Sequence, residues 1–540
     1  MGMVDEQALS SAPCVAAPSF LAQLHHRVGF TGWVVVLVVT CGLGYVGLHV
    51  AADLSGTAPG LTFPFLLLAL ALLIALGFEF VNGFHDTANA VATVIYTNSM
   101  PPSLAVVFSG LFNLLGVLAS SGAVAFTIVA LLPVELILQV GSAAGFAMVF
   151  ALLLSAIIWN LGTWYFGLPS SSSHTLIGSI VGVGLTNQFL AGPSGTSGVD
   201  WSQVGMVGRA LLLSPLIGFT LAALLLLLCK WLVPMPSLYR APQGEQPPPL
   251  WIRGLLVFTC AGVSFAHGSN DGQKGMGLIM LILIGTVPTA YALNRAVSES
   301  DVTTFQQTAE RAIVALHRAG EPLPAAPFDA RTALTDYLRT RILSHSVLPS
   351  LETISAEISQ EVASYRSLAL VPAGDVSNVR NDMYLVGESL RLLRKQRHLS
   401  LAAEDQLALA DFTASLDRAT KFIPAWVKVA VAIALGMGTM IGWKRIVVTV
   451  GERIGKSHLT YAQGGAAELV AMTTISAAES FGLPISTTHT LSSGVAGTMA
   501  ANRSGLQRQT VRNILLTWML TLPASIAISG LLYCLLRRIL

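Results

Sequence analysis

The chain has 540 residues, of which 53% are hydrophobic and only 11% are charged, and its formal net charge is +2. This composition excludes an ordinary soluble globular protein and is typical of a protein that crosses a membrane several times. The five cysteines are scattered without metal-ligand spacing, so neither a disulfide framework nor a metal site is expected. We expect a lipid bilayer as partner, no nucleic acid and no cofactor.

Nearly uncharged stretches recur along the chain and predict membrane-spanning helices. A bilayer core needs about 20 apolar residues per helix, which gives roughly ten to twelve crossings, some of them interrupted. The first stretch is too long for a secretory signal and lacks a small-residue cleavage site. We therefore interpret residues 29–51 as an extra, retained span that follows a tail of residues 1–28.

Charge is concentrated in one segment. Between Arg295 and Lys421 there are 14 Lys/Arg and 16 Asp/Glu, so this stretch is not membrane. Helix-like patterns interrupted by a proline-rich break predict a soluble helical domain of residues 295–422, inserted on the cytoplasmic side. The patterns cover residues 305–317, 333–343, 351–365 and 383–393, and the break covers residues 322–327.

Two motifs occur twice, in the same order. Residues 167–176 read GLPSSSSHTL and residues 482–491 read GLPISTTHTL, with seven identities. They are preceded by NGFHDTANA at 82–90 and HGSNDGQKG at 267–275. The distance between the motifs is longer in the second half by 130 residues, which matches the charged segment. The sequence therefore predicts an internal duplication. The copies are residues 61–235 and residues 250–294 continued by 423–540.

Positive charges in short loops predict that the two copies run in opposite directions. Arg27 precedes the first span, whereas the loop at 51–60 has no Lys or Arg, so the next span should enter from outside. The second copy follows a basic stretch at 230–253 and should enter from inside. Inverted repeats with broken helices that meet near the midplane are the architecture of secondary transporters. The basic loop at 443–456 does not fit this count.

Each GLP sequence is followed by hydroxyl side chains suited to an oxyanion. Pro169 and Pro484 suit the first turn of a helix, where the missing N–H costs nothing. Backbone N–H groups at a helix start carry partial positive charge and bind phosphate-like groups, and two copies would direct two such starts at one anion. Alternatively, the hydroxyls only bond back to the preceding helical turn. The candidate substrate ligands are Ser171, Ser172, Ser173, Ser486, Thr487 and Thr488.

Asp86 and Asp271 are expected to complete this site. A carboxylate within a membrane segment is unfavourable by about 3 kcal/mol, so it usually faces the bundle interior and serves an ion or proton path. The alternative is a solvated position at the end of a span. Phosphate near neutral pH carries O–H donors that a carboxylate accepts, whereas sulfate carries none. The two carboxylates therefore favour phosphate over sulfate.

Other polar residues in apolar surroundings have more open roles. His174 and His489 follow the hydroxyl runs, but no G-x-S-x-G elbow or third partner accompanies them, so a hydrolase is disfavoured. We expect them to pack or to form hydrogen bonds behind the anion site. The remaining polar residues could bridge helices or line the path, with solvation at span ends favoured for the glutamates. They are Asn113, Asn160, Gln463, Glu79, Glu468 and Glu479.

The motifs GFHDTANA, GLPSSSSHTL, GSNDGQKG and GLPISTTHT resemble those of the Pit family of inorganic phosphate transporters, most closely its bacterial low-affinity, proton-coupled members. The resemblance covers residues 61–293 and 423–540. It implies an all-α, multi-pass protein of the bacterial cytoplasmic membrane that binds phosphate between two inverted copies. The matching positions that it assigns to substrate and cation sites are Asp86, Asn89, Asp271, Ser171 to Ser173 and Ser486 to Thr488.

The motifs depart from those of sodium-coupled relatives, which show N-D-x-x-N in both copies. Here His85 replaces the first Asn of one copy and Lys274 the last Asn of the other. Protonated His and Lys are donors only, hence poor sodium ligands, and histidine titrates near neutral pH. We therefore hypothesise proton coupling rather than sodium coupling, with Lys274 offsetting negative charge or forming a structural ion pair. The expected coupling residues are His85, Asp86, Asn89, Asn270, Asp271 and Lys274.

Three functions follow as hypotheses. The first is a proton symporter that imports phosphate, and also arsenate or metal–phosphate complexes as the resemblance implies. The second is a symporter of another oxyanion, chiefly sulfate. The third is a membrane sensor that binds phosphate without flux and signals through the inserted domain. The chain has no P-loop, so direct drive by ATP is not expected, and we expect no enzyme. A homo-oligomer is left open.

Overall fold

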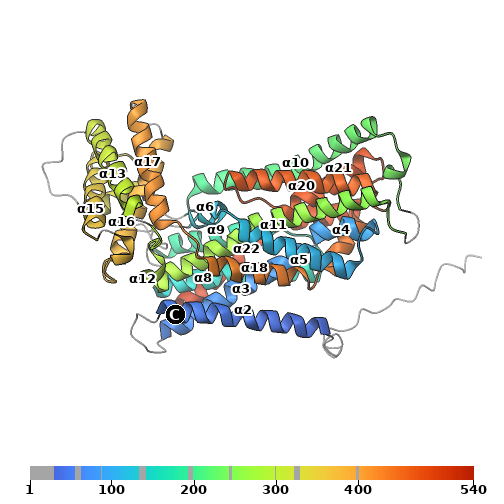
Figure 1. Ribbon diagram of the computed structural model, residues 1–540, viewed down its shortest axis with the longest axis horizontal. Helices are drawn as coiled ribbons and strands as arrows, with labels where there is room; N and C mark the ends of the chain where they lie inside the picture. The colour runs from blue at the N-terminus through green and yellow to red at the C-terminus, as the bar shows by residue number, and fades with distance from the viewer. Residues whose placement is uncertain are drawn as a thin grey trace, which may run out of the picture.

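The computed structural model describes residues 30–54, 63–86, 88–132, 142–191, 199–242, 246–297, 299–320, 329–365, 367–396 and 401–540. Within these residues the regular structure is helical, apart from one isolated bridge between Gly455 and Leu506. Long helices lie side by side, and a separate group of helices stands at one end of them (Figure 1). The expectation of an all-α fold is confirmed. The tail of residues 1–28 and the break at 322–327 lie outside the described residues.

Seven helical segments of the described chain are long and apolar enough to cross a membrane. Their helices are α2 (Phe30–Leu54), α3 (Phe63–Asp86) with α4 (Ala88–Tyr96), α5 (Pro102–Ala119), α8 (Ala143–Tyr165), α10 (Trp201–Leu232), α11 (Leu250–Thr286) and α22 (Arg508–Ile539). Many of their large apolar side chains are exposed, as a lipid-facing surface requires. The chain is a multi-pass membrane protein.

This number is smaller than the ten to twelve crossings expected, because several apolar helices do not reach spanning length or are too polar. They are α9 (Ser172–Ala191), α18 (Ala425–Thr439), α20 (Tyr461–Ser480) and α21 (Thr487–Ala501). An eighth span would be α18 taken with the preceding helix, from which it is bent by 72°. The short α6 (Ala123–Val129), α12 (Pro288–Tyr291) and α19 (Lys444–Val448) complete the bundle.

The two GLP sequences turn two helical hairpins, α8–α9 and α20–α21. Gly167 and Gly482 have φ of 66° and 64°, the left-handed conformation in which glycine ends a helix. In both hairpins the following leucine N–H bonds back to the last turn: Leu168 to the carbonyl of Thr163 and Leu483 to that of Ala478, each at 2.9 Å. The motif thus terminates one helix before the next begins.

The expectation that Pro169 and Pro484 occupy the first helical turn is wrong. The helices begin at Ser172 and Thr487, and the prolines lie in the loops before them. The start is set by the hydroxyl of the preceding serine, which can accept a hydrogen bond from a backbone N–H of the first turn.

Corresponding helices of the two halves exchange partners. Helix α9 packs on α22 while α21 packs on α10, and α3 packs on α18 while α11 packs on α5. The aligned motif glycines lie at equivalent close approaches. A Cβ at Gly83 would lie 2.2 Å from the carbonyl oxygen of Leu435, and one at Gly268 would lie 2.1 Å from that of Asn113. This pattern favours an internal duplication; the opposite direction of the copies stays a prediction.

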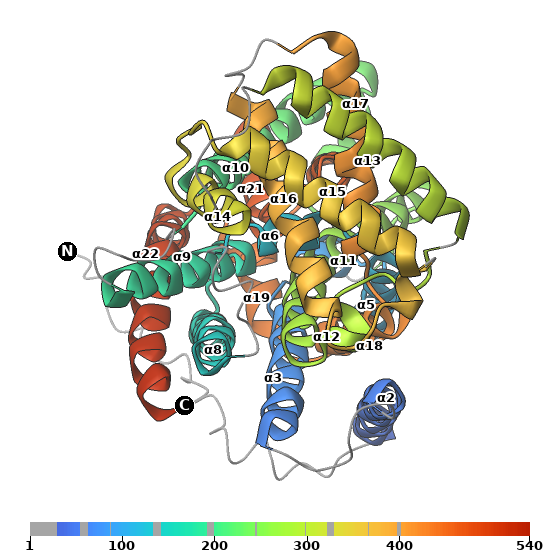
Figure 2. The same cartoon turned by 90° about the vertical axis from the view of Figure 1, so that its left-hand side faces the viewer.

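In the described part of the charged segment, five α-helices share a hydrophobic core of their own. They are α13 (Glu299–Ala319), α14 (Ala330–Thr340), α15 (Val347–Tyr365), α16 (Val376–Gln396) and α17 (Ala403–Thr420). Figure 2 shows them in front of the long helices. Arg341 forms an ion pair with Asp200 at 2.6 Å, which ties this group to the start of α10. The side of the membrane on which it lies stays a prediction.

The motif glycines give a test of this packing. We expect Gly83→Ala and Gly268→Ala to lower the free energy of unfolding by about 1–3 kcal/mol, because the added methyl group would push apart two helix backbones. Gly77→Ala on α3 and Gly254→Ala on α11 are matched controls, since no atom lies within 4 Å of a Cβ there. The midpoint of thermal unfolding, measured on each detergent-purified variant, compares the motif variants with the controls. Equal midpoints for motif and control variants would contradict the tight packing.

Candidate functional site

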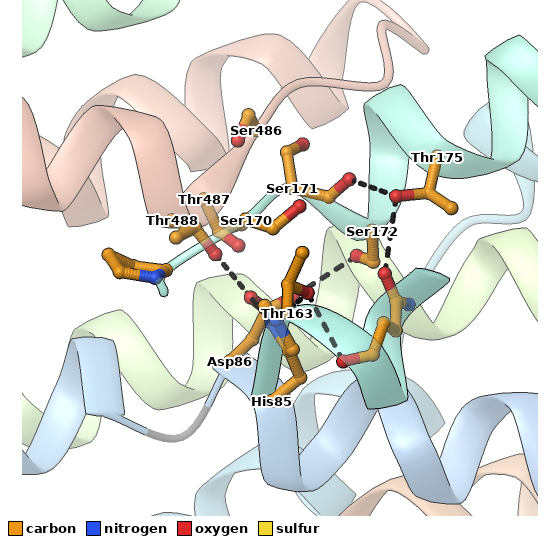
Figure 3. Close-up of polar contacts among 12 residues, drawn as sticks. His85, Asp86, Thr163, Ser170, Ser171, Ser172, Thr175, Ser486, Thr487 and Thr488 are labelled. Atoms are coloured by element: carbon orange, nitrogen blue, oxygen red, sulfur yellow. Dashed lines mark hydrogen bonds and ion pairs between the residues drawn. The ribbon is translucent and has the colours of Figure 1, made fainter. Parts of the chain in front are cut away.

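Asp86 and Asp271 lie where the two hairpins meet. The Ser172 hydroxyl, from the first hairpin, donates to Asp86 Oδ2 at 3.1 Å and to Asp271 Oδ2 at 3.5 Å. From the second hairpin, Thr487 donates to Asp271 at 3.5 Å and Thr488 donates to Asp86. Figure 3 shows Ser172 and Thr488 approaching Asp86 from different helices. Both carboxylates are at most 2% exposed, so neither is solvated at the end of a span.

The other three predicted hydroxyls hold the hairpin loops. Ser171 accepts the backbone N–H of His174 at 3.2 Å, and Ser486 accepts that of His489 at 3.1 Å. Both serines are therefore N-caps, which fix where α9 and α21 begin. Ser173 donates to the carbonyl oxygen of Ile485 at 2.6 Å and so joins the two loops. The six hydroxyls thus form two sets. Three of them contact the carboxylates, and the other three fix the loops that hold the first set in place.

Basic side chains surround the two carboxylates. Lys274 Nζ lies 2.8 Å from Asp271 Oδ1, so Lys274 forms the ion pair considered from the sequence. His85 Nδ1 lies 3.4 Å from Asp86 Oδ1. His267 Nε2 lies 3.4 Å from Asp271 Oδ2 and 3.7 Å from Asp86 Oδ2. An anion that reached the starts of α9 and α21 would meet the partial positive charge of the two helix N-termini.

His267 was missed by the sequence analysis. Its spacing from Asp271 and Lys274, four and seven residues, places all three on one face of α11, and this signal could have found it. Thr163 was missed as well; its hydroxyl lies 3.1 Å from His85 Nε2. Nothing in the spacing of Thr163 identifies it, because the contact depends on how α8 packs on α3.

The two matching histidines of the repeat lie together behind the hydroxyls. The rings of His174 and His489 are 4.5 Å apart, and that of His489 stacks on Trp518 at 3.9 Å. His174 Nδ1 also lies 2.9 Å from the hydroxyl oxygen of Ser171. This arrangement agrees with packing behind the site and contains no catalytic triad.

The remaining candidates, Asn270, Gln463 and Asn89, differ in their surroundings. Asn270 donates to the carbonyl oxygen of Leu483, in the second hairpin loop, at 3.2 Å. Gln463 forms a capping box with Thr460 at the start of α20, so its hydrogen bonds there stabilise a helix end. The side chain of Asn89 lies outside the described part of the chain.

Two of the glutamates are buried, contrary to the expectation that they are solvated at span ends. Glu79 and Glu468 are both 0% exposed. Thr259 donates to Glu468 at 2.5 Å, and Glu79 lies against the backbone of Gly275, beside Lys274. Burial of these carboxyl groups results from helix packing, which periodicity alone does not reveal.

The amides predicted to bridge helices or line the path lie in buried contacts. Asn113 on α5 lies 2.7 Å from His267 on α11 and donates to Thr439 on α18 at 3.1 Å. Asn160 accepts the Thr175 hydroxyl across the first hairpin at 3.2 Å. Asn113 therefore bridges helices, and it contacts His267, which faces the two carboxylates.

Asp86, His267 and Asp271 also offer ligand atoms within 4.8 Å of one another, a spacing that a metal ion could use. Lys274 already places an ammonium group against Asp271. Its positive charge opposes a second cation at the same carboxylate. The donor set therefore suits an anion with its protons better than a resident metal.

Comparison with known proteins identifies the family. Residues 82–529 match the family described as "PHO4: Phosphate transporter family". The chain is 42% identical over 488 residues to the "Low-affinity inorganic phosphate transporter PitB" of Escherichia coli (strain K12), covering 87% of this chain and 96% of the relative. It is 41% identical over 487 residues to PitA of the same strain, with the same coverage.

More distant proteins match as well. A "Probable low-affinity inorganic phosphate transporter" of Bacillus subtilis (strain 168) is 28% identical over 478 residues, 88% of this chain and 99% of the relative. The solved structure "The sodium-dependent phosphate transporter" aligns with 88% of this chain at a TM-score of 0.48 and 19% identity, which is too low to support a conclusion. The family match and the two relatives above 40% identity confirm the resemblance seen in the four motifs: the chain belongs to the phosphate transporter family.

Proposed function

We propose that this chain imports inorganic phosphate across the bacterial cytoplasmic membrane by proton symport. The observation that carries the proposal is the convergence of Ser172, Thr487 and Thr488, at the starts of two helices, on the buried Asp86 and Asp271. Helix starts bind oxyanions through their N–H groups. The names of the relatives, low-affinity inorganic phosphate transporters, support the same substrate.

The carboxylates favour phosphate over sulfate. Phosphate near neutral pH keeps one or two O–H groups that Asp86 and Asp271 can accept, whereas sulfate has none and would meet only repulsion there. A ligand that leaves a buried acceptor without a donor binds more weakly, and this difference in affinity lets such a site discriminate phosphate from sulfate. Arsenate has the shape and the protons of phosphate and should compete. Neutral metal–phosphate complexes are further substrates under this proposal.

Protons are favoured over sodium as the coupling ion. The two positions that depart from the sodium-type motif, His85 and Lys274, both lie at the carboxylates. Neither side chain offers a lone pair to sodium when it is protonated. The sequence analysis named His85, Asp86 and Asp271 as candidate proton carriers, and contacts through His267 join these three residues into one group.

A phosphate sensor is the second candidate, because the inserted helices contact the transport bundle. Arg341 pairs with Asp200, which caps the start of α10, and Lys395 donates to Ser202 in the first turn of the same helix. Helix α10 in turn packs on α21, at whose start the site lies. The sensor predicts phosphate binding without net flux.

Uptake into sealed liposomes tests the proposal. We expect labelled phosphate to accumulate under an inward proton gradient without sodium, and excess arsenate but not sulfate to block it. The anions differ in the O–H groups that the two aspartates can accept. Accumulation driven only by sodium would overturn the coupling ion, competition by sulfate would favour the second oxyanion hypothesis, and binding without accumulation would favour the sensor.

Removal of a single hydroxyl tests the site. Ser172→Ala should raise the phosphate concentration for half-maximal uptake by about tenfold or more, because a hydrogen bond to a charged group contributes about 1.5–3 kcal/mol. Ser480→Ala on α20 is the matched control, since that exposed hydroxyl donates to the carbonyl oxygen of Ser476 on its own helix. A Ser172→Ala variant with unchanged concentration dependence would place phosphate elsewhere.

A further inference from the structure

His267 occupies the point where both halves of the transporter meet. It is 4% exposed, and its Nε2 faces one carboxylate from each half: Asp86 on α3 at 3.7 Å and Asp271 on α11 at 3.4 Å. Its other nitrogen, Nδ1, lies 2.7 Å from Asn113 Oδ1 on α5. The sequence analysis did not select this residue.

The hydrogen bonds behind the ring determine which nitrogen carries a hydrogen. Thr439 donates its hydroxyl hydrogen to the carbonyl oxygen of Leu435 at 2.9 Å, so its oxygen accepts from Asn113 Nδ2 at 3.1 Å. This orients the Asn113 amide and leaves its Oδ1, an acceptor, against His267 Nδ1. Nδ1 therefore carries a hydrogen and donates it to Asn113.

With Nδ1 protonated, a neutral His267 would present the lone pair of Nε2 to two carboxylates. That arrangement is repulsive when Asp86 and Asp271 are both ionised. One proton among the three groups removes the repulsion, because Nε2–H can then donate to either aspartate. The observed geometry therefore fits a site in which His267, Asp86 and Asp271 share one proton in addition to the hydrogen on Nδ1.

This proton sets the charge that an incoming anion meets. A proton on His267 adds one positive charge beside Asp86 and Asp271. Loss of that proton makes the site more negative by one charge, which disfavours phosphate. Binding of phosphate and binding of the proton are therefore mutually favourable, as symport requires.

The other titratable groups around His267 do not take over this position. On α3, His85 faces Asp86, and Glu79 lies farther along beside Gly275. Thr163 donates its hydroxyl hydrogen to carbonyl oxygens of its own helix, so His85 Nε2 donates to Thr163, and only Nδ1 faces a carboxylate. That carboxylate belongs to the same half as His85.

The residues that face His267 from α5 and α18 are uncharged. Asn113 and, behind it, Thr439 form this side of the network. On its own helix, Lys274 pairs with Asp271 and holds that carboxylate in place. Among these groups, His267 is the titratable side chain that contacts carboxylates of both halves.

We propose that His267 holds the co-transported proton on Nε2, shared with Asp86 and Asp271, an inference that rests on the proposed proton symport. The proton enters with phosphate from one side, forms the N–H bond, and leaves to water on the other side after phosphate departs. No other bond is made or broken. Opening of either half would withdraw one carboxylate from the ring and so loosen the proton.

His267→Gln tests this assignment in proteoliposomes, because glutamine keeps a hydrogen-bond donor but cannot gain or lose a proton in the working range. For the wild type, an inward gradient of one pH unit should drive roughly tenfold accumulation per coupled proton. For His267→Gln we expect an accumulation ratio of about one, while exchange of labelled for unlabelled phosphate across the membrane continues at a reduced rate. A pH-sensitive dye outside the vesicles should report no proton uptake with phosphate.

Exchange without accumulation identifies a folded but uncoupled transporter, which a merely structural role of His267 would not produce. His458→Gln, at an exposed histidine, is the control and should keep the wild-type ratio. If His267→Gln exchanges no phosphate, His267→Asn is measured in the same way. Full proton-driven accumulation in either variant, or uncoupling in His85→Gln instead, would overturn the assignment. A wild type that is not proton-driven would instead refute the proposed symport itself.

Discussion

The fold depends on two carboxylates that are buried in the protein interior. An ionised aspartate there is costly unless charges and hydrogen bonds compensate it. Asp86 and Asp271 are compensated by groups from both halves: Ser172 belongs to the first half, and Lys274, Thr487 and Thr488 belong to the second. Neither half alone supplies the full set. The requirement to bury these charges therefore holds the hairpins and α3 and α11 together at one place.

The same arrangement makes the site responsive to movement between the halves. The motif glycines let α3 lie on α18 and α11 on α5 at backbone contact, so each aspartate is carried on a helix that packs against the other half. A movement at this interface would therefore pull the carboxylates, the hydroxyls and His267 away from one another at the same time. Interfaces of this kind tend to be bistable rather than continuously deformable, which suits a transporter that exposes one site to two sides in turn.

Much of this site could be predicted from the sequence because the duplication repeats it. The paired motifs identified both aspartates and the six hydroxyls, and a charged segment in an apolar chain marked the inserted helices. What the sequence did not reveal depends on packing between distant helices. His267 acquires its role from Asp86 and Asn113 on other helices. Helix α17 was missed because its apolar residues show weak periodicity. Each GLP sequence ends one helix at its glycine, and the next helix begins after the proline, at Ser172 or Thr487, not at the proline as expected.

A structure determined with phosphate bound tests the central claim most directly. The account predicts one tetrahedral density between the starts of α9 and α21, in contact with Ser172 and Thr487 and within hydrogen-bonding distance of Asp86 or Asp271. Helix starts and acceptor carboxylates would then share one substrate. Density at any other place, such as among the inserted helices, with these hydroxyls still bonded to the aspartates, would contradict it.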